Sequence, residues 1–152
     1  MLKLVRTDSS NQDFQNLVKA LDSELKQRDG EEHTFFAQFN KIDLIRHVVV
    51  AYQNNEVVGC GAMKEYTSGA MEIKRMFVPF EQRGKGIAGN VLDELEKWAQ
   101  ELGYSKCILE TGLKQPEAIR LYEKNKYLRI ANYGQYEKVS SSVCFEKILP
   151  TR

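Results

Sequence analysis

The sequence lacks the features that would assign it to several large classes of protein. It contains no apolar run of about 18 residues, the length of a membrane-spanning helix, and its short, charged beginning does not resemble a signal peptide. Its 22 basic and 21 acidic residues are interspersed and leave a net charge of +1, so no overall field attracts nucleic acid or a membrane surface. We therefore expect a soluble, cytoplasmic protein that binds neither nucleic acid nor membranes.

Cysteine and histidine are too scarce and too scattered for a metal site or a disulfide framework. Cys60, Cys107 and Cys144 form no Cys-x-x-Cys pair, and neither His33 nor His47 is near a cysteine in sequence. Metal-binding and disulfide-rich proteins use clusters of these residue types. We therefore expect no metal, and three buried, unreactive thiols in a reducing compartment.

The spacing of apolar residues predicts alternating strands and helices in one domain over residues 1–152, long enough to bury roughly 70% of its unfolded surface. Strands are predicted over residues 2–6, 47–52, 56–65, 70–78, 106–110, 127–133 and 143–148. Helices are predicted from a capping box at Ser10 to residue 29, over a turn or two in 34–39, and over 84–102 and 116–126. This order indicates a mixed α/β sheet flanked by helices.

The segment from Glu72 to Gly89 is the most informative part of the chain. An apolar strand leads into a basic, glycine-rich loop, and the loop opens a long amphipathic helix. The first free amides of a helix, together with its dipole, attract anions such as pyrophosphate. Arg83 and Lys85 add positive charge at the same place. The segment therefore predicts a site for a ligand that carries a pyrophosphate.

Two nucleotide-binding patterns fit this loop poorly. The segment has no Gly-x-x-x-x-Gly-Lys-Ser/Thr, which excludes a P-loop. Gly84-x-Gly86-x-x-Gly89 does match the dinucleotide fingerprint, with Glu110 about 20 residues further on. Residues 79–83, however, separate the strand from the first glycine. Only about 40 residues follow Glu110, too few for the strand–helix units that a dinucleotide fold still needs.

A third pattern, Arg83-x-x-Gly86-x-Ala88, resembles the acetyl-coenzyme A loop of the GNAT superfamily of N-acetyltransferases. A second segment, residues 118–124 (AIRLYEK), resembles the family's Ala-x-x-Leu/Phe-Tyr-x-Lys helix, although Lys126 stands where the family usually has glycine. The order of elements is similar over nearly the whole chain. The resemblance implies the GNAT fold: a mixed, mostly antiparallel sheet of about seven strands with about four helices, splayed where acetyl-CoA binds.

The resemblance also implies a cofactor site. The backbone at the end of the strand would pair with the pantetheine arm, and the loop amides would hold the pyrophosphate. The amide near Val78 would stabilise the oxyanion, and Gln115 stands where many relatives carry a cofactor-contacting asparagine. The implied cofactor-binding residues are Met76, Phe77, Val78, Arg83, Gly84, Lys85, Gly86, Ile87, Ala88, Gly89 and Gln115.

Two residues are expected to transfer protons. Tyr122 falls at the family's catalytic tyrosine and would donate a proton to the leaving thiolate, with a core tyrosine as the structural alternative. Glu72 corresponds to the glutamate base of some members, with an ion pair to Lys74 or Arg75 as the structural alternative. Glu110 is the reserve base, and ordered water is a further alternative.

The acceptor is expected to contact residues 31–40 and 133–136, where acidic and polar groups alternate with aromatic ones. The expected substrate-binding residues are Phe36, Asn40, Glu110 and Tyr136. The resulting hypothesis is an N-acetyltransferase that moves an acetyl group from acetyl-CoA to a primary amine of a small molecule by direct attack in a ternary complex. The alternatives are acetylation of protein lysines or N-termini, and a non-catalytic acyl-CoA sensor. A homodimer is a further expectation, since the final strands often pair subunits in relatives.

Overall fold

The computed structural model describes residues 1–29 and 45–151, which form one seven-stranded sheet with helices on both faces. The strands are β1 (Leu2–Thr7), β2 (His47–Gln53), β3 (Glu56–Thr67), β4 (Ala70–Phe77), β5 (Lys106–Gly112), β6 (Leu128–Ile130) and β7 (Ser142–Ile148). The α-helices are α1 (Gln12–Asp29), α3 (Ile87–Glu101) and α4 (Pro116–Lys124), and short 3₁₀ helices cover Phe80–Gln82 and Gly134–Tyr136. No described helix has the length and apolar content needed to cross a membrane.

The sheet has the strand order β1-β2-β3-β4-β5-β7-β6 and is antiparallel except where β4 and β5 run parallel. This confirms the predicted mixed, mostly antiparallel sheet of seven strands. Three of the four expected α-helices lie in the described residues, and the short helix predicted over 34–39 falls outside them.

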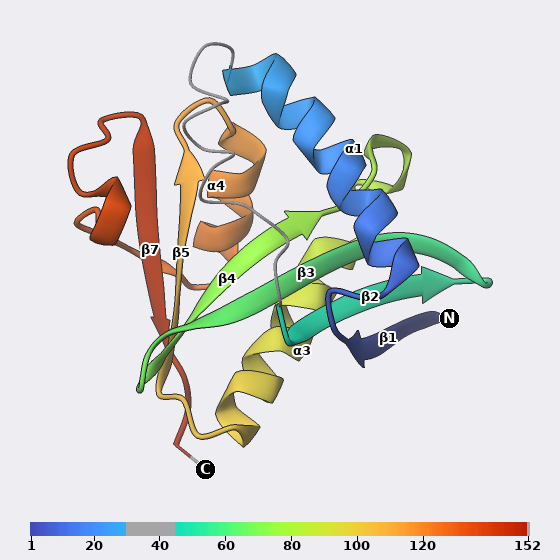
Figure 1. Cartoon of the computed structure of the whole chain (residues 1–152), viewed down its shortest axis with the longest axis horizontal. Helices are drawn as coiled ribbons and strands as arrows, with labels where there is room; N and C mark the ends of the chain where they lie inside the picture. The colour runs from blue at the N-terminus through green and yellow to red at the C-terminus, as the bar shows by residue number, and fades with distance from the viewer. Residues whose placement is uncertain (30–44, 152) are drawn as a thin grey trace.

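Each face of the sheet is covered by helices, as Figure 1 shows with α1 in front of the central strands and α3 behind them. Phe14, Val18 and their neighbours in α1 pack on Val48, Val50 and Ala62. Residues of α3 pack on the opposite face, against alternating residues of the same strands. Because side chains alternate along a strand, β2 and β3 can be apolar on both faces and form the centre of two cores.

Strands β4 and β5 separate after a short stretch of pairing. They pair only at Ala70–Lys106, Met71–Cys107 and Glu72–Ile108, and then diverge (Figure 1). Among the described strands, none pairs with the β5-facing edge of β4 beyond Glu72. The second half of β4 therefore keeps backbone groups on an unpaired edge inside the molecule, where an extended ligand can bind.

The structure corrects four local predictions. Helix α3 begins at Ile87 rather than at residue 84, because Gly84 and Gly86 have φ values of 81° and 78°, outside the helical region. Leu102, the last residue of the helix predicted over 84–102, follows α3 as its C-cap and is 45% exposed. The cap of α1 is Asn11, whose Oδ1 accepts a hydrogen bond from the Phe14 amide at 2.9 Å, so Ser10 is not the cap.

Ser10 instead donates hydrogen bonds to Asp8, through its amide at 2.9 Å and its hydroxyl at 2.5 Å. The fourth correction is the length of β6, which covers Leu128–Ile130 instead of the predicted residues 127–133. Lys126, which replaces the glycine usual in the family, adopts φ = 71° after α4. It keeps the left-handed turn that glycine would make at lower conformational cost.

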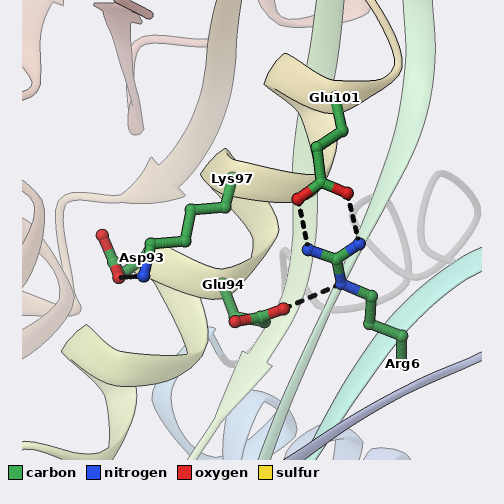
Figure 2. A network of polar contacts seen from close by, with 5 residues as sticks. All are labelled: Arg6, Asp93, Glu94, Lys97 and Glu101. Atoms are coloured by element: carbon green, nitrogen blue, oxygen red, sulfur yellow. Dashed lines mark hydrogen bonds and ion pairs between the residues drawn. The ribbon is translucent and has the colours of Figure 1, made fainter.

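A polar network fastens the edge strand β1 to α3. Figure 2 shows the Arg6 guanidinium donating to Glu94 at 2.8 Å and to both oxygens of Glu101 at 2.8 and 2.9 Å. The same guanidinium lies 5.1 Å from the ring centre of Trp98. The bidentate geometry orders the side chain, although its partial exposure limits the contribution to stability. The network helps to fix α3, whose N-terminus follows residues 78–86, here called the glycine loop.

Candidate active site

Two cavities meet beside the unpaired edge of β4. The first, here called the long groove, has a volume of about 470 Å³ and runs between the end of β4, the glycine loop and α4. The second, the inner pocket, has a volume of about 110 Å³ and lies between β4, the end of β5 and α1. Both cavities are lined by Leu21, Met76, Gln115, Ala118 and Tyr122. These shared residues place Tyr122 at the junction of the two cavities.

Ten of the eleven predicted cofactor-binding residues line the long groove: Met76, Phe77, Val78, Arg83, Gly84, Gly86, Ile87, Ala88, Gly89 and Gln115. Gly86 is the N-cap of α3, so the amides of the first turn open toward this end of the groove. They supply a partial positive charge whether or not a basic side chain is nearby. The groove thus combines an extended backbone edge with an anion-attracting helix N-terminus.

Of the two basic side chains of the loop, Arg83 lines the long groove and Lys85 does not. Lys85 is exposed, donates to Gln82 at 3.1 Å and is not part of the groove lining. Arg83 does line the groove, but its Nη2 pairs with Glu24 of α1 at 2.8 Å and its Nε donates to the Val78 carbonyl at 2.8 Å. Arg83 therefore ties the loop to α1, and Glu24 offsets part of its charge.

Tyr122 is buried within the aromatic cluster that α4 forms with the sheet. Its ring packs 5.8 Å from that of Tyr127 and 6.1 Å from that of Phe145, measured between centres. Burial is the main cause that raises the pKa of the Tyr122 phenol well above its ordinary value of 10, and the negative charge of Glu110 raises it further. The hydroxyl is therefore protonated at neutral pH, which is the state a proton donor needs.

Glu72 lies on β4 in the lining of the inner pocket and is 7% exposed. The Tyr133 hydroxyl donates to its Oε2 at 2.6 Å, and Lys74 pairs with its Oε1 at 3.4 Å. Burial, and then the charge of Glu72, raise the pKa of Tyr133, so this phenol remains a donor. Of the two ion-pair partners considered from the sequence, Lys74 is the one that Glu72 has, and Arg75 pairs elsewhere.

The other predicted substrate residues are divided between the inner pocket and the part of the chain that is not described. Glu110 and Tyr136 both line the pocket, and the Ser142 hydroxyl donates to Glu110 Oε2 at 2.7 Å. Tyr136 is buried and packs edge-on against Tyr133, with 5.9 Å between ring centres. Phe36 and Asn40 lie outside the described residues. The inner pocket therefore contains carboxylates from two different strands.

Several lining residues were not predicted. Leu21, Glu24 and Leu25 reach the cavities from α1, and Arg75 reaches the inner pocket from β4. The helical periodicity of α1 identifies its buried face but not the part of that face that ends at a cavity. Arg75 stands within the segment used for the prediction and was considered only as an ion-pair partner of Glu72.

All three cysteines are buried and free. Burial is the main cause that raises the pKa of Cys60 and of Cys107 to about 12 and that of Cys144 to about 11. A thiol with such a pKa is almost entirely protonated at neutral pH, and a protonated thiol is a poor nucleophile. None of the three lines either cavity.

The native protein is therefore expected to react very slowly with a disulfide reagent such as Ellman's reagent. At pH 8 fewer than about one thiol in ten is expected to react within the time that denatured protein needs for completion. The measurement compares absorbance with and without denaturant, and the denatured sample should reach three thiols per chain. Rapid labelling of one thiol in the native protein would contradict the burial described above.

The chain matches a family model described as "Acetyltransferase (GNAT) family" over residues 11–127. It is 38% identical over 102 residues to an "IAA acetyltransferase" of Azospirillum brasilense, a match that covers 66% of this chain and 67% of the relative. It is 33% identical over 101 residues to a Bacillus subtilis protein named "Uncharacterized N-acetyltransferase YsnE", covering 65% of this chain and 67% of that one.

Solved structures show the same architecture. A Klebsiella pneumoniae protein whose name assigns it to the acyl-CoA N-acyltransferases superposes with a TM-score of 0.78 and 28% identity, covering 98% of both chains. The PaiA N-acetyltransferase of Thermoplasma acidophilum, solved with coenzyme A, superposes with a TM-score of 0.72 and 17% identity, covering 97% of this chain and 99% of that one. At that identity the second likeness shows the fold alone. With its family model matched over most of its length, this chain belongs to the acetyltransferase (GNAT) family and is an acyltransferase.

Proposed function

We propose that this protein transfers an acetyl group from acetyl-CoA to the primary amine of a small molecule. The observation that carries the proposal is the junction of the long groove and the inner pocket at Tyr122. One cavity has the features that fit an extended thioester with a pyrophosphate, and the other has the carboxylates that fit an amine. The sequence relatives reported above carry acetyltransferase names, which supports the same assignment.

The long groove fits acetyl-CoA in two respects. The unpaired edge of β4 offers backbone donors and acceptors to the amides of an extended pantetheine arm, as a further strand would use them. The first turn of α3 from Ile87, preceded by Gly86, offers free amides and the positive end of the helix dipole to a pyrophosphate. Because Arg83 is paired with Glu24, we assign most of the anion binding to the backbone.

The chain supplies the groups that acetyl transfer needs. Bound acetyl-CoA would provide the thioester, whose carbonyl carbon is attacked by an amine and whose sulfur leaves as a thiolate. Glu72 would accept a proton from the acceptor's ammonium group before attack, and Tyr122 would give its hydroxyl proton to the leaving sulfur. The attacking nitrogen would lose its second proton as the amide forms, and that proton would restore the Tyr122 hydroxyl. The Val78 amide, at the end of β4, would donate to the carbonyl oxygen as negative charge develops there.

Direct attack in a ternary complex is favoured over an acyl-enzyme. The three thiols are buried, protonated and outside both cavities, so the described cavity walls hold no cysteine nucleophile. The modest size of the inner pocket favours a small acceptor over a protein lysine or N-terminus. We also propose that residues 1–152 act as one domain in the cytoplasm, and that the edge strand β6 is available for pairing in a homodimer.

Thermal unfolding with and without acetyl-CoA tests the proposal. At about 100 times its Kd, acetyl-CoA is expected to add roughly 2.7 kcal/mol to the free energy of unfolding and to raise Tm by several degrees. NAD serves as the control, because the glycine loop also matches the dinucleotide fingerprint. A shift with NAD alone would overturn the assignment of the groove. If acetyl-CoA raises Tm but none of the tested amines causes thiol release, the sensor alternative is favoured.

A further inference from the structure

Arg75 is a buried cation in the lining of the inner pocket. Its side chain is 3% exposed, yet it has few partners. Nη1 pairs with Asp22 Oδ1 at 3.1 Å, while Nε is buried and has no hydrogen-bond partner among the described residues. A guanidinium carries five N–H donors, and a buried donor without an acceptor is costly. Arg75 therefore has donor capacity that the described protein groups do not use.

A bulge in β4 turns Arg75 toward this pocket. Lys74 is opposite Ala62 and Phe77 is opposite Cys60, so two residues of β4, Arg75 and Met76, lie across from one residue of β3. Lys74 and Phe77 therefore occupy the same face despite being three positions apart. In an unbroken strand Arg75 would follow Ile73 into the core under α3, but the bulge places it on the α1 face instead, where it pairs with Asp22.

This placement is unfavourable for the protein alone. The backbone of Arg75 has φ = 60°, a region that L-residues with a side chain occupy at an energetic cost. Burial is the main cause that lowers the pKa of its guanidinium, and Asp22 offsets this only in part. The Asp22 side chain is itself 49% exposed, so its charge is well solvated. A strained, buried and incompletely paired arginine is typical of a ligand site.

The inner pocket is lined by equal numbers of acidic and basic side chains. Glu72 and Glu110 contribute two carboxylates, and Lys74 and Arg75 contribute two cations. Lys74 already pairs with Glu72 at 3.4 Å. A polyamine, which carries several positive charges and no negative one, would bring no acceptor to a buried arginine that Asp22 compensates only in part. A molecule that carries both an ammonium and a carboxylate group would match the pocket.

We propose that the acetyl acceptor is an amino acid or a similar amino carboxylate, whose carboxylate pairs with Arg75 while its amine is directed to Glu72 and Tyr122. This inference rests on the proposed function. An arginine is suited to the role because its planar fork binds a carboxylate through two parallel hydrogen bonds. The carboxylate supplies the acceptors that Arg75 lacks, and its binding would orient the amine at the junction of the two cavities.

The first experiment uses the wild-type protein and matched pairs of acceptors. Initial rates with acetyl-CoA are measured for each common L-amino acid, for its α-carboxamide, and for spermidine. The amide keeps the amine and the side chain and replaces the negatively charged carboxylate with a neutral group. At least one acid is expected to react with a kcat/KM about 100-fold or more above that of its amide. Amides that react as well as their acids, or turnover of spermidine alone, would overturn the inference.

The second experiment tests the assignment to Arg75. Arg75→Gln is expected to raise KM for the preferred acid about 100-fold and to leave KM for the amide within about 3-fold. Arg120→Gln, which removes an exposed arginine outside both cavities, is the control and should change neither value. If Arg75→Gln does not fold, Arg75→Lys keeps the charge and is expected to retain part of the preference. A preference that survives Arg75→Gln unchanged would refute the assignment.

A binding measurement separates this inference from the proposed function. Thermal unfolding in the presence of coenzyme A, which carries no acetyl group, is followed as the acid or its amide is added. In one outcome the acid stabilises the protein at a lower concentration than the amide does, while no amine is turned over. That result would support the carboxylate site and refute the transferase proposal. Turnover of amines without preference for a carboxylate would refute the inference and leave the transferase. If nothing binds or reacts, both fail.

Discussion

Replacing Tyr122 with phenylalanine is expected to lower kcat at least about 10-fold, and up to about 1,000-fold, with little change in the Kd of acetyl-CoA. The substitution removes one hydroxyl and keeps the ring that packs against Tyr127 and Phe145. The pKa of this phenol is raised by burial, so at neutral pH the wild-type residue carries the proton that the leaving thiolate needs. Steady-state rates of thiol release and thermal shifts with acetyl-CoA measure the two quantities separately.

Tyr52→Phe is a matched control for this experiment. Its hydroxyl donates to Asp13 at 2.6 Å, and the residue lines neither cavity. The control should lose a little stability and keep kcat within about 2-fold. Full turnover by Tyr122→Phe would show that another group or a water protonates the thiolate. A wild-type protein that binds acetyl-CoA without any turnover would point to the sensor.

The arrangement of strands and helices could be predicted from the sequence because burial leaves a periodic pattern. The β-branched apolar run of β2 and the apolar stripe of α3 indicated these elements directly. The ends of elements were harder, since each depends on a local competition that periodicity does not report. Gly84 and Gly86 fit a helical pattern in sequence, yet their positive φ values exclude them from α3. At α1, two neighbouring polar residues could cap the helix, and Asn11 does so.

The site was predictable where it is contiguous in sequence and not where it is assembled across the fold. The end of β4, the loop and the start of α3 adjoin one another, so one motif indicated most of the long groove. Arg83 and Glu24, which pair, are 59 positions apart in the sequence. Tyr133 and Glu72, which share a hydrogen bond, are 61 positions apart. The direction of Arg75 depends on a one-residue bulge that reverses the alternation of the strand. No residue pattern that we used reports such a reversal.

Replacing Glu72 with glutamine is expected to lower kcat/KM about 100-fold or more at neutral pH, and the loss should shrink as the pH rises. The amide keeps the size of the side chain and an oxygen that can accept from Tyr133, but it cannot accept a proton from the substrate. Without a base the enzyme can use only acceptor molecules whose amine is already neutral. The neutral fraction of the amine grows with pH until the pKa of the amine is passed. The measurement is kcat/KM against pH for both proteins.

This pH dependence distinguishes a base from a structural carboxylate. If Glu72 only balances the charge of Lys74 and anchors Tyr133, its replacement should lower stability and reduce the rate by the same factor at every pH. Glu110→Gln is the matched comparison, because Glu110 lines the same pocket from β5 and is held by Ser142 at 2.7 Å. A loss that narrows at high pH in Glu110→Gln but not in Glu72→Gln would move the base to Glu110. Full activity in both variants would leave ordered water as the proton acceptor.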